Sequence, residues 1–292
     1  MTRLRPRPAL DVRVEIRGQL PREDTEYARA RALDTAAALA GSVAGDPAVA
    51  GAGELGVGEL GAGVLRIRLT RVRDRSVTRP VLAQADLALA DLGPVRVQLA
   101  TGTAQESVDL ALGTLVGRAV RLSEQGDIGF AAVHESAWRP QFAARPLAER
   151  RIARRKAVVL ARRTPAEAAR EMLALDRRFQ LFSDTRTGRD SLVHRSLPDG
   201  APVLLRAGTG VGESDPGPDA HLPIRTEPQA VGRLGLDEAA RRLWLTGAPF
   251  VFHADPVDGR GRVLYRRYDG HYGLITPVAE GAFGAGIPPA HG

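Results

Sequence analysis

The sequence predicts an α+β protein, with an N-terminal β-α-β-β-β-α domain followed by two tandem copies of a small β-α-β-β-β module. Short segments with apolar residues at every second position, typical of half-buried strands, alternate with longer segments whose apolar residues recur at helical spacing. In addition, a set of residues near the C-terminus repeats an earlier set at a constant offset of 71 positions. Such a repeat indicates a duplicated structural unit.

Composition excludes several classes of protein. With 43% hydrophobic and 26% charged residues among 292, the chain has the composition of an ordinary globular protein. It contains no cysteine, which excludes a disulfide framework, a thiolate nucleophile and a Cys-ligated zinc. No apolar h-region follows the arginines of residues 1–10, and no apolar run reaches the roughly 18 residues of a membrane-spanning helix. We therefore expect a cytoplasmic protein without membrane contact.

The N-terminal domain is expected over residues 1–125. Its predicted elements are, in order, strand 11–17, helix 22–39, strands 64–72, 81–89 and 95–99, and helix 103–124. The apolar stripes predicted for the two helices are Tyr27, Ala30, Leu33 and Ala37, and Val108, Leu112, Leu115, Ala119 and Leu122. Since both stripes must be buried, both helices should pack on the apolar face of the sheet. The Gly-rich residues 41–63 are expected to form a flexible surface insertion.

The opposite face of this sheet is predicted to be rich in arginine. Its outward positions include Arg13, Arg17, Arg66, Arg68 and Arg96, and the connection over residues 71–79 adds Arg71, Arg73 and Arg75. Such a surface can bind RNA phosphates. The alternative is that these are ordinary solvated positions of a half-exposed sheet, diluted by Glu15 and Asp86.

The repeat places residues 179–184 against 250–255 and residues 192–195 against 263–266. We therefore expect two modules, over residues 150–206 and 224–292, separated from each other by the linker 207–223 and from the N-terminal domain by the linker 126–149. In the first copy we expect a strand at 157–161, a capping box at 164–167, a strand at 179–182, a tight turn at 184–188, and strands at 191–195 and 203–206.

These repeated segments carry a resemblance to a known family. Residues 262–275 (RVLYRRYDGHYGLI) resemble the end of the C-terminal module of long ribosome hibernation-promoting factors, and residues 154–156 and 179–182 match the front of that module. The N-terminal β-α-β-β-β-α pattern, including residues 108–112, resembles the family's ribosome-binding domain. The resemblance covers nearly the whole chain apart from the linkers.

The resemblance implies a ribosome hibernation factor without catalytic activity, which silences translation under stress or dormancy. In such factors the N-terminal domain binds the decoding region of the small ribosomal subunit and blocks the mRNA and tRNA paths. The C-terminal module of long forms dimerises and thereby pairs two ribosomes. The chain departs from this pattern because it has two C-terminal modules and a Gly-rich insertion.

Tandem modules predict pairing within one chain, because the linker 207–223 holds them at an effective concentration in the millimolar range. The net charge of +7 over residues 126–206 and of −2 over residues 207–292 favours this pairing. The predicted interface consists of Phe179, Leu181, Val193, Phe250, Phe252, Leu264 and Tyr265. We expect a monomer that silences single ribosomes, with a homodimer as the alternative.

The predicted rRNA-binding residues are arginines and one lysine. They are Arg13, Arg17, Arg66, Arg68, Arg71, Arg73, Arg75 and Arg96, with Arg118 and Arg121 on the last helix and Arg154, Arg155 and Lys156 from the basic run 150–163. For the basic run, a role as a solvated face is an equal alternative.

Other chemistry is not supported by the sequence. The two G-x-G-x-x-G matches at residues 51–56 and 56–61 have no clear strand before them and a strand after them, contrary to a dinucleotide-binding context. Residues 255–259 fit a hairpin turn better than a calcium loop, and the six histidines show no metal-binding spacing. We therefore expect no cofactor and no metal. The rival function is a stress-response protein–protein adaptor that acts through the tandem modules without binding ribosomes.

Overall fold

In the computed structural model, the described residues are 10–42, 63–89, 92–125, 139–196, 200–207, 224–227 and 231–279. The chain divides into two compact units, residues 1–143 with 173–177, and residues 144–172 with 178–292. Most of the Gly-rich insertion and most of both predicted linkers lie outside the described residues. Among the residues that are described, no helix is long and apolar enough to cross a membrane.

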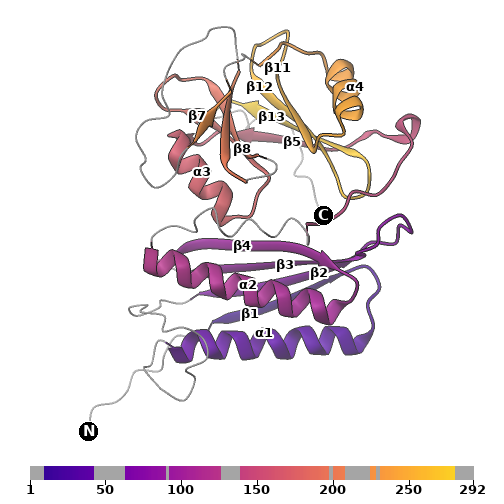
Figure 1. The fold of residues 1–292 in the computed structure, drawn as a ribbon, viewed down its shortest axis with the longest axis vertical. Helices are drawn as coiled ribbons and strands as arrows, with labels where there is room; N and C mark the ends of the chain where they lie inside the picture. Colours follow the sequence, from indigo (N-terminus) through magenta and orange to yellow (C-terminus); the bar gives the residue numbers. More distant parts are fainter. Residues whose placement is uncertain are drawn as a thin grey trace. The chain divides into compact units, whose positions relative to one another are not determined.

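The first unit contains the predicted β-α-β-β-β-α order (Figure 1). Its elements are β1 (Asp11–Arg17), α1 (Arg22–Ser42), β2 (Val64–Arg71), β3 (Val81–Leu89), β4 (Gly93–Thr101) and α2 (Ala104–Gln125). The sheet has the order β1-β2-β3-β4, in which β1 and β2 are parallel and the other neighbours antiparallel. The parallel pair follows from the crossover through α1, whereas short turns can join the antiparallel strands.

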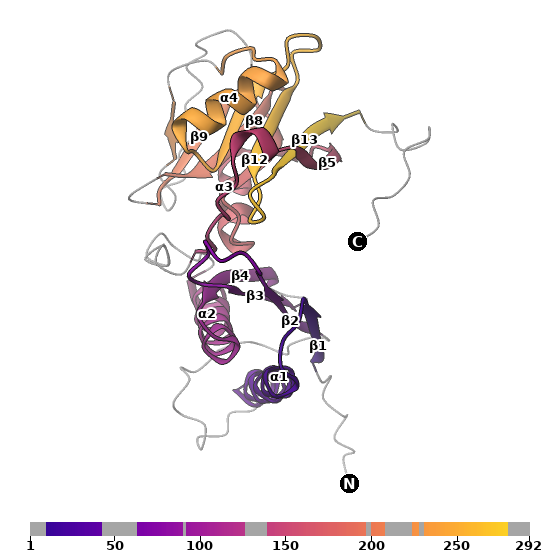
Figure 2. The ribbon, with the colours of Figure 1, turned by 90° about the vertical axis from the view of Figure 1, so that its right-hand side faces the viewer.

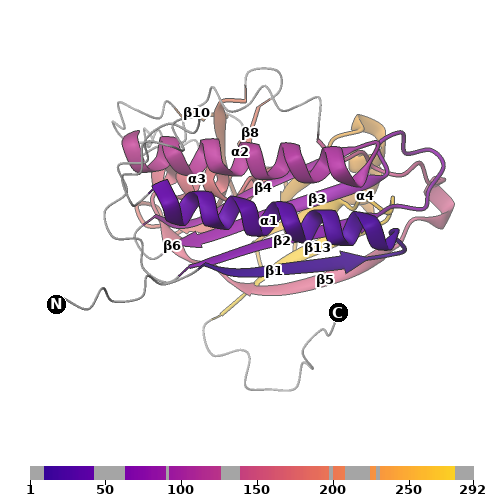
Figure 3. The ribbon, with the colours of Figure 1, turned by 90° about the horizontal axis from the view of Figure 1, so that it is seen from below.

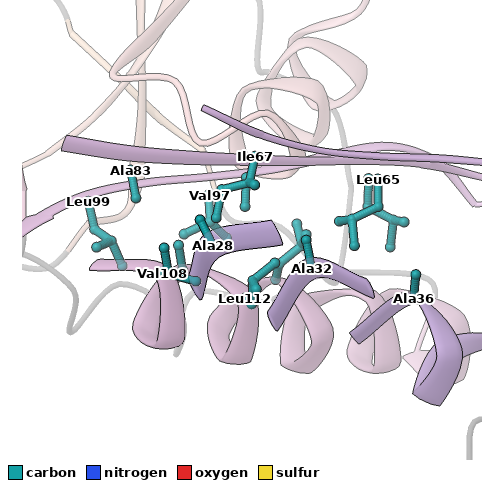
Figure 4. Close-up of a cluster of buried hydrophobic side chains, with 14 of the residues drawn as sticks. Ala28, Ala32, Ala36, Leu65, Ile67, Ala83, Val97, Leu99, Val108 and Leu112 are labelled. Atoms are coloured by element: carbon teal, nitrogen blue, oxygen red, sulfur yellow. The ribbon is translucent and has the colours of Figure 1, made fainter. Parts of the chain in front are cut away.

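Both helices cover one face of this sheet and run side by side, roughly along the direction of its strands (Figure 3). In the core, the alanines Ala28, Ala32 and Ala36 of α1 face the sheet residues Leu65 and Ile67 (Figure 4). Between the helices, the Asp109 carboxylate accepts hydrogen bonds from the Tyr27 hydroxyl at 2.7 Å and from Arg31 Nε at 2.8 Å. Burial acts to raise the pKa of Asp109, but the Tyr27 hydrogen bond and Arg31 together lower it below its ordinary value, so this link between the helices is a charged one.

The predicted apolar stripe of α1 is confirmed at Tyr27, which packs against the core, but it is wrong at Ala30, Leu33 and Ala37. Leu33 is 51% exposed and Ala30 is also exposed, whereas Ala28, Ala32, Ala36 and Leu39 are buried. Small side chains allow the helix backbone to approach the sheet closely, so alanine rather than the bulkier Leu33 occupies the contact line. The stripe predicted for α2 is confirmed at Val108, Leu112, Leu115 and Ala119.

The described part of the second unit contains two sheets, the 3₁₀-helix η3 (Leu147–Glu149) and two short α-helices. These are α3 (Pro165–Ala174), of which Leu173 and Ala174 are counted with the first unit, and α4 (Leu236–Thr246). One sheet has the order β10-β9-β8-β7-β6 and the other the order β11-β12-β13-β5. The strands of the first sheet are β6 (Arg162–Arg163), β7 (Phe179–Asp184), β8 (Asp190–Arg195), β9 (Pro202–Arg206) and β10 (Arg225–Thr226). The strands of the second are β5 (Ile152–Val159), β11 (Phe250–Ala254), β12 (Gly261–Arg266) and β13 (Tyr272–Val278).

The two copies of the module exchange their leading strands. Strand β5 precedes α3 in the chain, yet it pairs in parallel with β13 of the second copy, where both lie side by side (Figure 2). Conversely, β10 precedes α4 and pairs in parallel with β9 of the first copy. The strand predicted at 157–161 is therefore wrong in its bounds and in its sheet, because the apolar pattern of an edge strand does not specify which sheet it joins.

The predicted turns and the predicted helix cap are confirmed. Gly188 and Gly259 have a φ of +68° in equivalent hairpin turns, a conformation that favours glycine. At the start of α3, the Thr164 amide donates a hydrogen bond to Glu167 Oε2 at 2.8 Å, and the Glu167 amide donates to Thr164 Oγ1 at 3.3 Å. This capping box lowers the pKa of Glu167. The equivalent cap of α4 is Gly235, which makes no side-chain hydrogen bond.

His253 on β11 is a buried titratable group, with an exposed fraction of 1%. Burial lowers its pKa below the ordinary value of 6.5, and the nearby Arg262 acts in the same direction. The nearby backbone of Leu234 and Ala254 and the carboxylate of Asp255 oppose this shift, although neither ring nitrogen of His253 has a hydrogen-bond partner among the described residues. The folded unit therefore favours the neutral form of the His253 imidazole.

The low pKa of His253 predicts a loss of stability in acid. Below about pH 6.5 the unfolded chain binds a proton that the folded chain excludes, so the free energy of unfolding falls with falling pH. His253→Phe removes this contribution, and the slope of the unfolding free energy against pH decreases by up to about 1.4 kcal/mol per pH unit. Urea unfolding between pH 5 and pH 7.5 measures both slopes.

A matched control exists in the first copy, where the equivalent position is the fully buried Phe182. Phe182→His should increase the same slope. Burial also lowers the pKa of His194, so part of the dependence of the unfolding free energy on pH remains in every variant. An unchanged slope in His253→Phe would contradict the assignment.

Candidate RNA-binding surface and module interface

The outward face of the first sheet carries its charges in rows that cross the strands. Arg13 of β1 lies opposite Arg66 of β2, which lies opposite Asp86 of β3, which in turn lies opposite Arg96 of β4. Residues directly opposite each other on one face are close enough for their side chains to interact. The sheet register thus brings together four of the arginines predicted for RNA binding: Arg13, Arg66, Arg68 and Arg96.

Carboxylates neutralise much of this face. Glu15 accepts a hydrogen bond from Arg68, with a shortest nitrogen–oxygen distance of 2.7 Å, and lies 3.4 Å from Arg66. Arg68 lowers the pKa of Glu15, which keeps the carboxylate ionised. Asp86 forms an ion pair with Arg96. The face is therefore less positive than its arginine content suggests.

The connection between β2 and β3 has a different charge balance. Arg71, Arg73 and Arg75 are all exposed, and so is Arg17 at the end of β1, opposite Thr70. Within the described parts of the chain, none of these four guanidinium groups lies within ion-pair distance of a carboxylate. We call Arg17, Arg71, Arg73 and Arg75 the loop patch. Although Arg17 interacts electrostatically with Glu15, the loop patch forms no ion pair among the described residues, which makes it the more attractive surface for a polyanion.

The loop that carries this patch is held in a defined conformation. Val77 is buried, and Asp74 Oδ1 accepts hydrogen bonds from the amide and hydroxyl of Ser76 at 2.9 and 2.6 Å. From the segment after α2, Gln141 Oε1 accepts hydrogen bonds from the amide and hydroxyl of Thr78 at 3.0 and 3.1 Å. Because the backbone is already ordered, binding through this loop costs less conformational entropy.

The prediction that Arg118 lies at the RNA-binding surface is wrong. Arg118 is fully buried, its Nη1 donates a hydrogen bond to the Arg96 carbonyl at 2.8 Å, and it lies 3.4 Å from the Asp176 carboxylate. Arg121 is half-buried. The helical spacing from Leu115 indicates this burial, because position 118 follows it by one turn on the sheet-facing side.

The basic residues of β5 lie at the edge of the second sheet. Arg154, Arg155 and Lys156 are exposed, and β5 has β13 as its only neighbour among the described strands of that sheet. Charged side chains on an edge strand also prevent pairing with further strands, which is a sufficient structural reason for them. The position nevertheless leaves their charges accessible to a large partner.

The two modules pack through the faces of their sheets. One buried cluster combines Leu181 and Leu192 from the first copy with Phe252 and Val263 from the second. Phe179, Phe250 and Tyr265 pack against this cluster, and the ring centroids of Phe179 and Phe250 are 4.8 Å apart. These contacts include five of the seven residues predicted for the interface: Phe179, Leu181, Phe250, Phe252 and Tyr265.

The interface prediction is wrong for Val193 and Leu264, because these two side chains lie on the faces of their strands that point away from the interface. Leu264 packs with Leu243 of α4 in the core of the second copy. Val193 lies opposite Gln180, on the other side of β8 from Leu192. Leu192 and Val263 occupy the interface in their place. Strand alternation alone fixes which residues share a face, but not which face meets the partner.

The described residues contain no group of three or more His, Asp or Glu side chains that could hold a metal ion. Residues 255–259 form a hairpin turn, in which Asp255 Oδ1 accepts hydrogen bonds from the amides of Val257 and Asp258 at 2.9 and 3.4 Å. The Asp255 carboxylate is thus hydrogen-bonded to the backbone of its own turn.

His194 packs edge-on against Phe250, with 5.4 Å between ring centroids.

Comparison with known proteins gives two findings. Residues 148–199 and 224–274 match the family described as Sigma 54 modulation/S30EA ribosomal protein C terminus. Two proteins named "Dormancy associated translation inhibitor", from the CDC 1551/Oshkosh and H37Rv strains of Mycobacterium tuberculosis, are each 35% identical to this chain over 211 residues. The similarity covers 69% of this chain and 72% of each relative. The two matched segments correspond to the two copies of the repeated module.

Proposed function

This chain belongs to the long ribosome hibernation-promoting factor family, and we propose that it silences translation by binding the small ribosomal subunit. Bound at the decoding region, the N-terminal unit blocks the mRNA and tRNA paths without catalysis and without a cofactor. The observation that carries the proposal is an ordered, exposed loop patch on a β-α-β-β-β-α unit, followed by two S30EA-type modules. The name of the Mycobacterium relatives supports inhibition during dormancy. A factor that binds ribosomes in this way acts in the cytoplasm.

The proposed rRNA contacts are ranked by available charge. The loop patch comes first, because its guanidinium groups are exposed and form no ion pair with a carboxylate among the described residues. The sheet arginines Arg13, Arg66, Arg68 and Arg96 come second, since Asp11, Glu15 and Asp86 neutralise part of their charge. Arg121 stays a minor contact, and the buried Arg118 is left out. Guanidinium groups bind phosphate through paired donors, so the contacts are mainly to the rRNA backbone.

Reversal of charge in the loop patch tests this assignment. Arg71→Glu with Arg73→Glu should weaken ribosome binding roughly 10- to 100-fold and reduce the slope of log affinity against log salt by about two, one per lost phosphate contact. Co-sedimentation with purified ribosomes over a range of salt concentrations measures both quantities.

The matched control is Arg241→Glu with Arg242→Glu on α4, which changes the net charge equally at two exposed positions. This variant should bind like the wild type. Equal loss in both variants would show that only net charge matters, and the loop patch would then not be the binding site.

We also propose that the exposed basic residues of β5 contact rRNA outside the decoding region. Two weak sites on one chain raise the overall affinity through effective concentration. Arg154→Glu with Arg155→Glu should therefore weaken ribosome binding roughly 10-fold while leaving the inhibited step unchanged. The assay and the control on α4 are the same, and unchanged affinity would assign these residues to edge protection only.

The packing of the two modules supports a monomeric factor. Each copy covers the sheet face of the other and supplies its leading strand, so the pair is an intrachain pseudo-dimer. In single-module relatives, the same surface is available to a second chain. We therefore propose that this factor silences single ribosomes.

A measurement of mass tests the monomer. Light scattering should give about 31 kDa for the free protein, the mass of one chain. Sucrose gradients of ribosomes saturated with the factor should contain no additional paired-ribosome peak. A stable homodimer, or a factor-dependent paired peak, would restore the ordinary long-form mechanism.

One observation favours the rival function, a protein–protein adaptor that does not bind ribosomes. Trp244 and Leu245 on α4 are 46% and 68% exposed, although large apolar side chains are usually buried. Sedimentation of the tagged protein from starved cells separates the two functions. The adaptor requires absence from small-subunit fractions together with recovery of a discrete protein partner.

A further inference from the structure

Two residues of the first copy contact their own counterparts in the second. With the offset of 71, Phe179 corresponds to Phe250 and Asp190 to Gly261. The two phenylalanine rings pack at 4.8 Å, and the Gly261 amide donates a hydrogen bond to Asp190 Oδ2 at 2.8 Å. Equivalent residues meet only on the axis that relates two copies, so both pairs lie on the approximate twofold axis of the second unit.

The two axis pairs differ in kind. Phe179 and Phe250 are identical, as a symmetric dimer requires. At the other pair, an aspartate faces a residue without a side chain. The Asp190 carboxylate also accepts hydrogen bonds from Arg260 Nε at 2.7 Å and Nη2 at 3.3 Å, and its side chain is only 9% exposed. It is therefore a nearly buried acid whose partners come from the other copy.

Gly261 is required by space. A Cβ atom at this position would lie 2.9 Å from Asp190 Cβ and 2.7 Å from Phe252 Cε2, closer than real contacts allow. Phe252 corresponds to Leu181 in the first copy. The first surface thus combines an acid with a smaller apolar residue, and the second combines a missing side chain with a larger one.

We propose that Asp190 and Gly261, supported by Leu181 and Phe252, make module pairing selective for unlike copies. Two first copies would bring two Asp190 side chains together on the axis, with their Cβ atoms in collision and two carboxylates in a nearly dry site. Two second copies would leave the Gly261 amide and Arg260 without their acceptor. The surface of the first copy therefore pairs more favourably with that of the second copy than either surface pairs with an identical one.

This inference deepens the proposed pairing within one chain and rests on it. Effective concentration favours the tethered partner, whereas the axis pair determines which surface can be a partner at all. The contact that would join two chains through one identical module each is disfavoured by collision and by lost hydrogen bonds. The proper partner of the first copy is a surface with glycine at the position of Gly261.

Exchange of the two surfaces within the full chain tests the proposal. Phe252→Leu with Gly261→Asp makes the second copy resemble the first, and Leu181→Phe with Asp190→Gly does the reverse. Each double variant should lower the folding equilibrium constant of the second unit at least about 10-fold in urea unfolding. The quadruple variant restores one acid facing one glycine, with Arg189 in the position equivalent to Arg260, and should recover to within about 3-fold of the wild type.

The two possible results are distinct. Recovery in the quadruple variant is expected only if the copies recognise each other at the axis. If the losses of the two double variants simply add, each residue serves its own module and the proposal is wrong.

A milder cycle covers the case in which the double variants do not fold. In chains that carry Phe252→Leu, which removes the ring that a Cβ at position 261 would also meet, Gly261→Ala should cost at least about 3-fold less with Asp190→Gly than without it, because the remaining collision partner is then gone. An equal cost in both backgrounds would overturn the proposal. None of these measurements involves ribosomes, so loss of ribosome binding and loss of pairing selectivity are scored separately.

Discussion

The second unit depends on the mutual burial of two sheet faces. Apart from its leading strand, each module has three antiparallel strands and one short helix. One face of this small sheet is covered by the helix of the module, and the other face must be covered by something else. Here the buried cluster of Leu181, Leu192, Phe252 and Val263 fills that space. Small units of this size rarely have enough core to be stable alone. The duplication thus supplies within one chain the partner that a single module must find elsewhere.

The N-terminal unit was largely predictable because its signals are local. Alternation over residues 64–71 and 81–89 and the turn at Gly93 fix strands and their faces without any long-range information. The stripe of α1 was missed because alanine has a weak hydrophobic signal but packs closest to the sheet. Arg118 was missed because its charge suggested a surface position, although its spacing on α2 indicates the core.

Properties that depend on pairing between distant segments were not predictable. The sheet joined by β5 and the interface faces of β8 and β12 depend on how two copies meet, which no single segment encodes. The same holds for charge. The arginines of the outward face are evident in the sequence, but their neutralisation by Glu15 and Asp86 depends on sheet register, and the ordered conformation of the neighbouring loop depends on Gln141.

The exchange of leading strands also has a consequence for the biosynthesis of the protein. Strand β5 begins at Ile152, and its register partner Tyr272 is synthesised 120 residues later. In a nascent chain, this basic strand therefore cannot find its partner before β13 has left the exit tunnel. The N-terminal unit has by then received all its strands, since domains fold as they emerge. Parallel pairing between segments so distant in sequence is intrinsically slow, so we expect the second unit to complete its folding after the first.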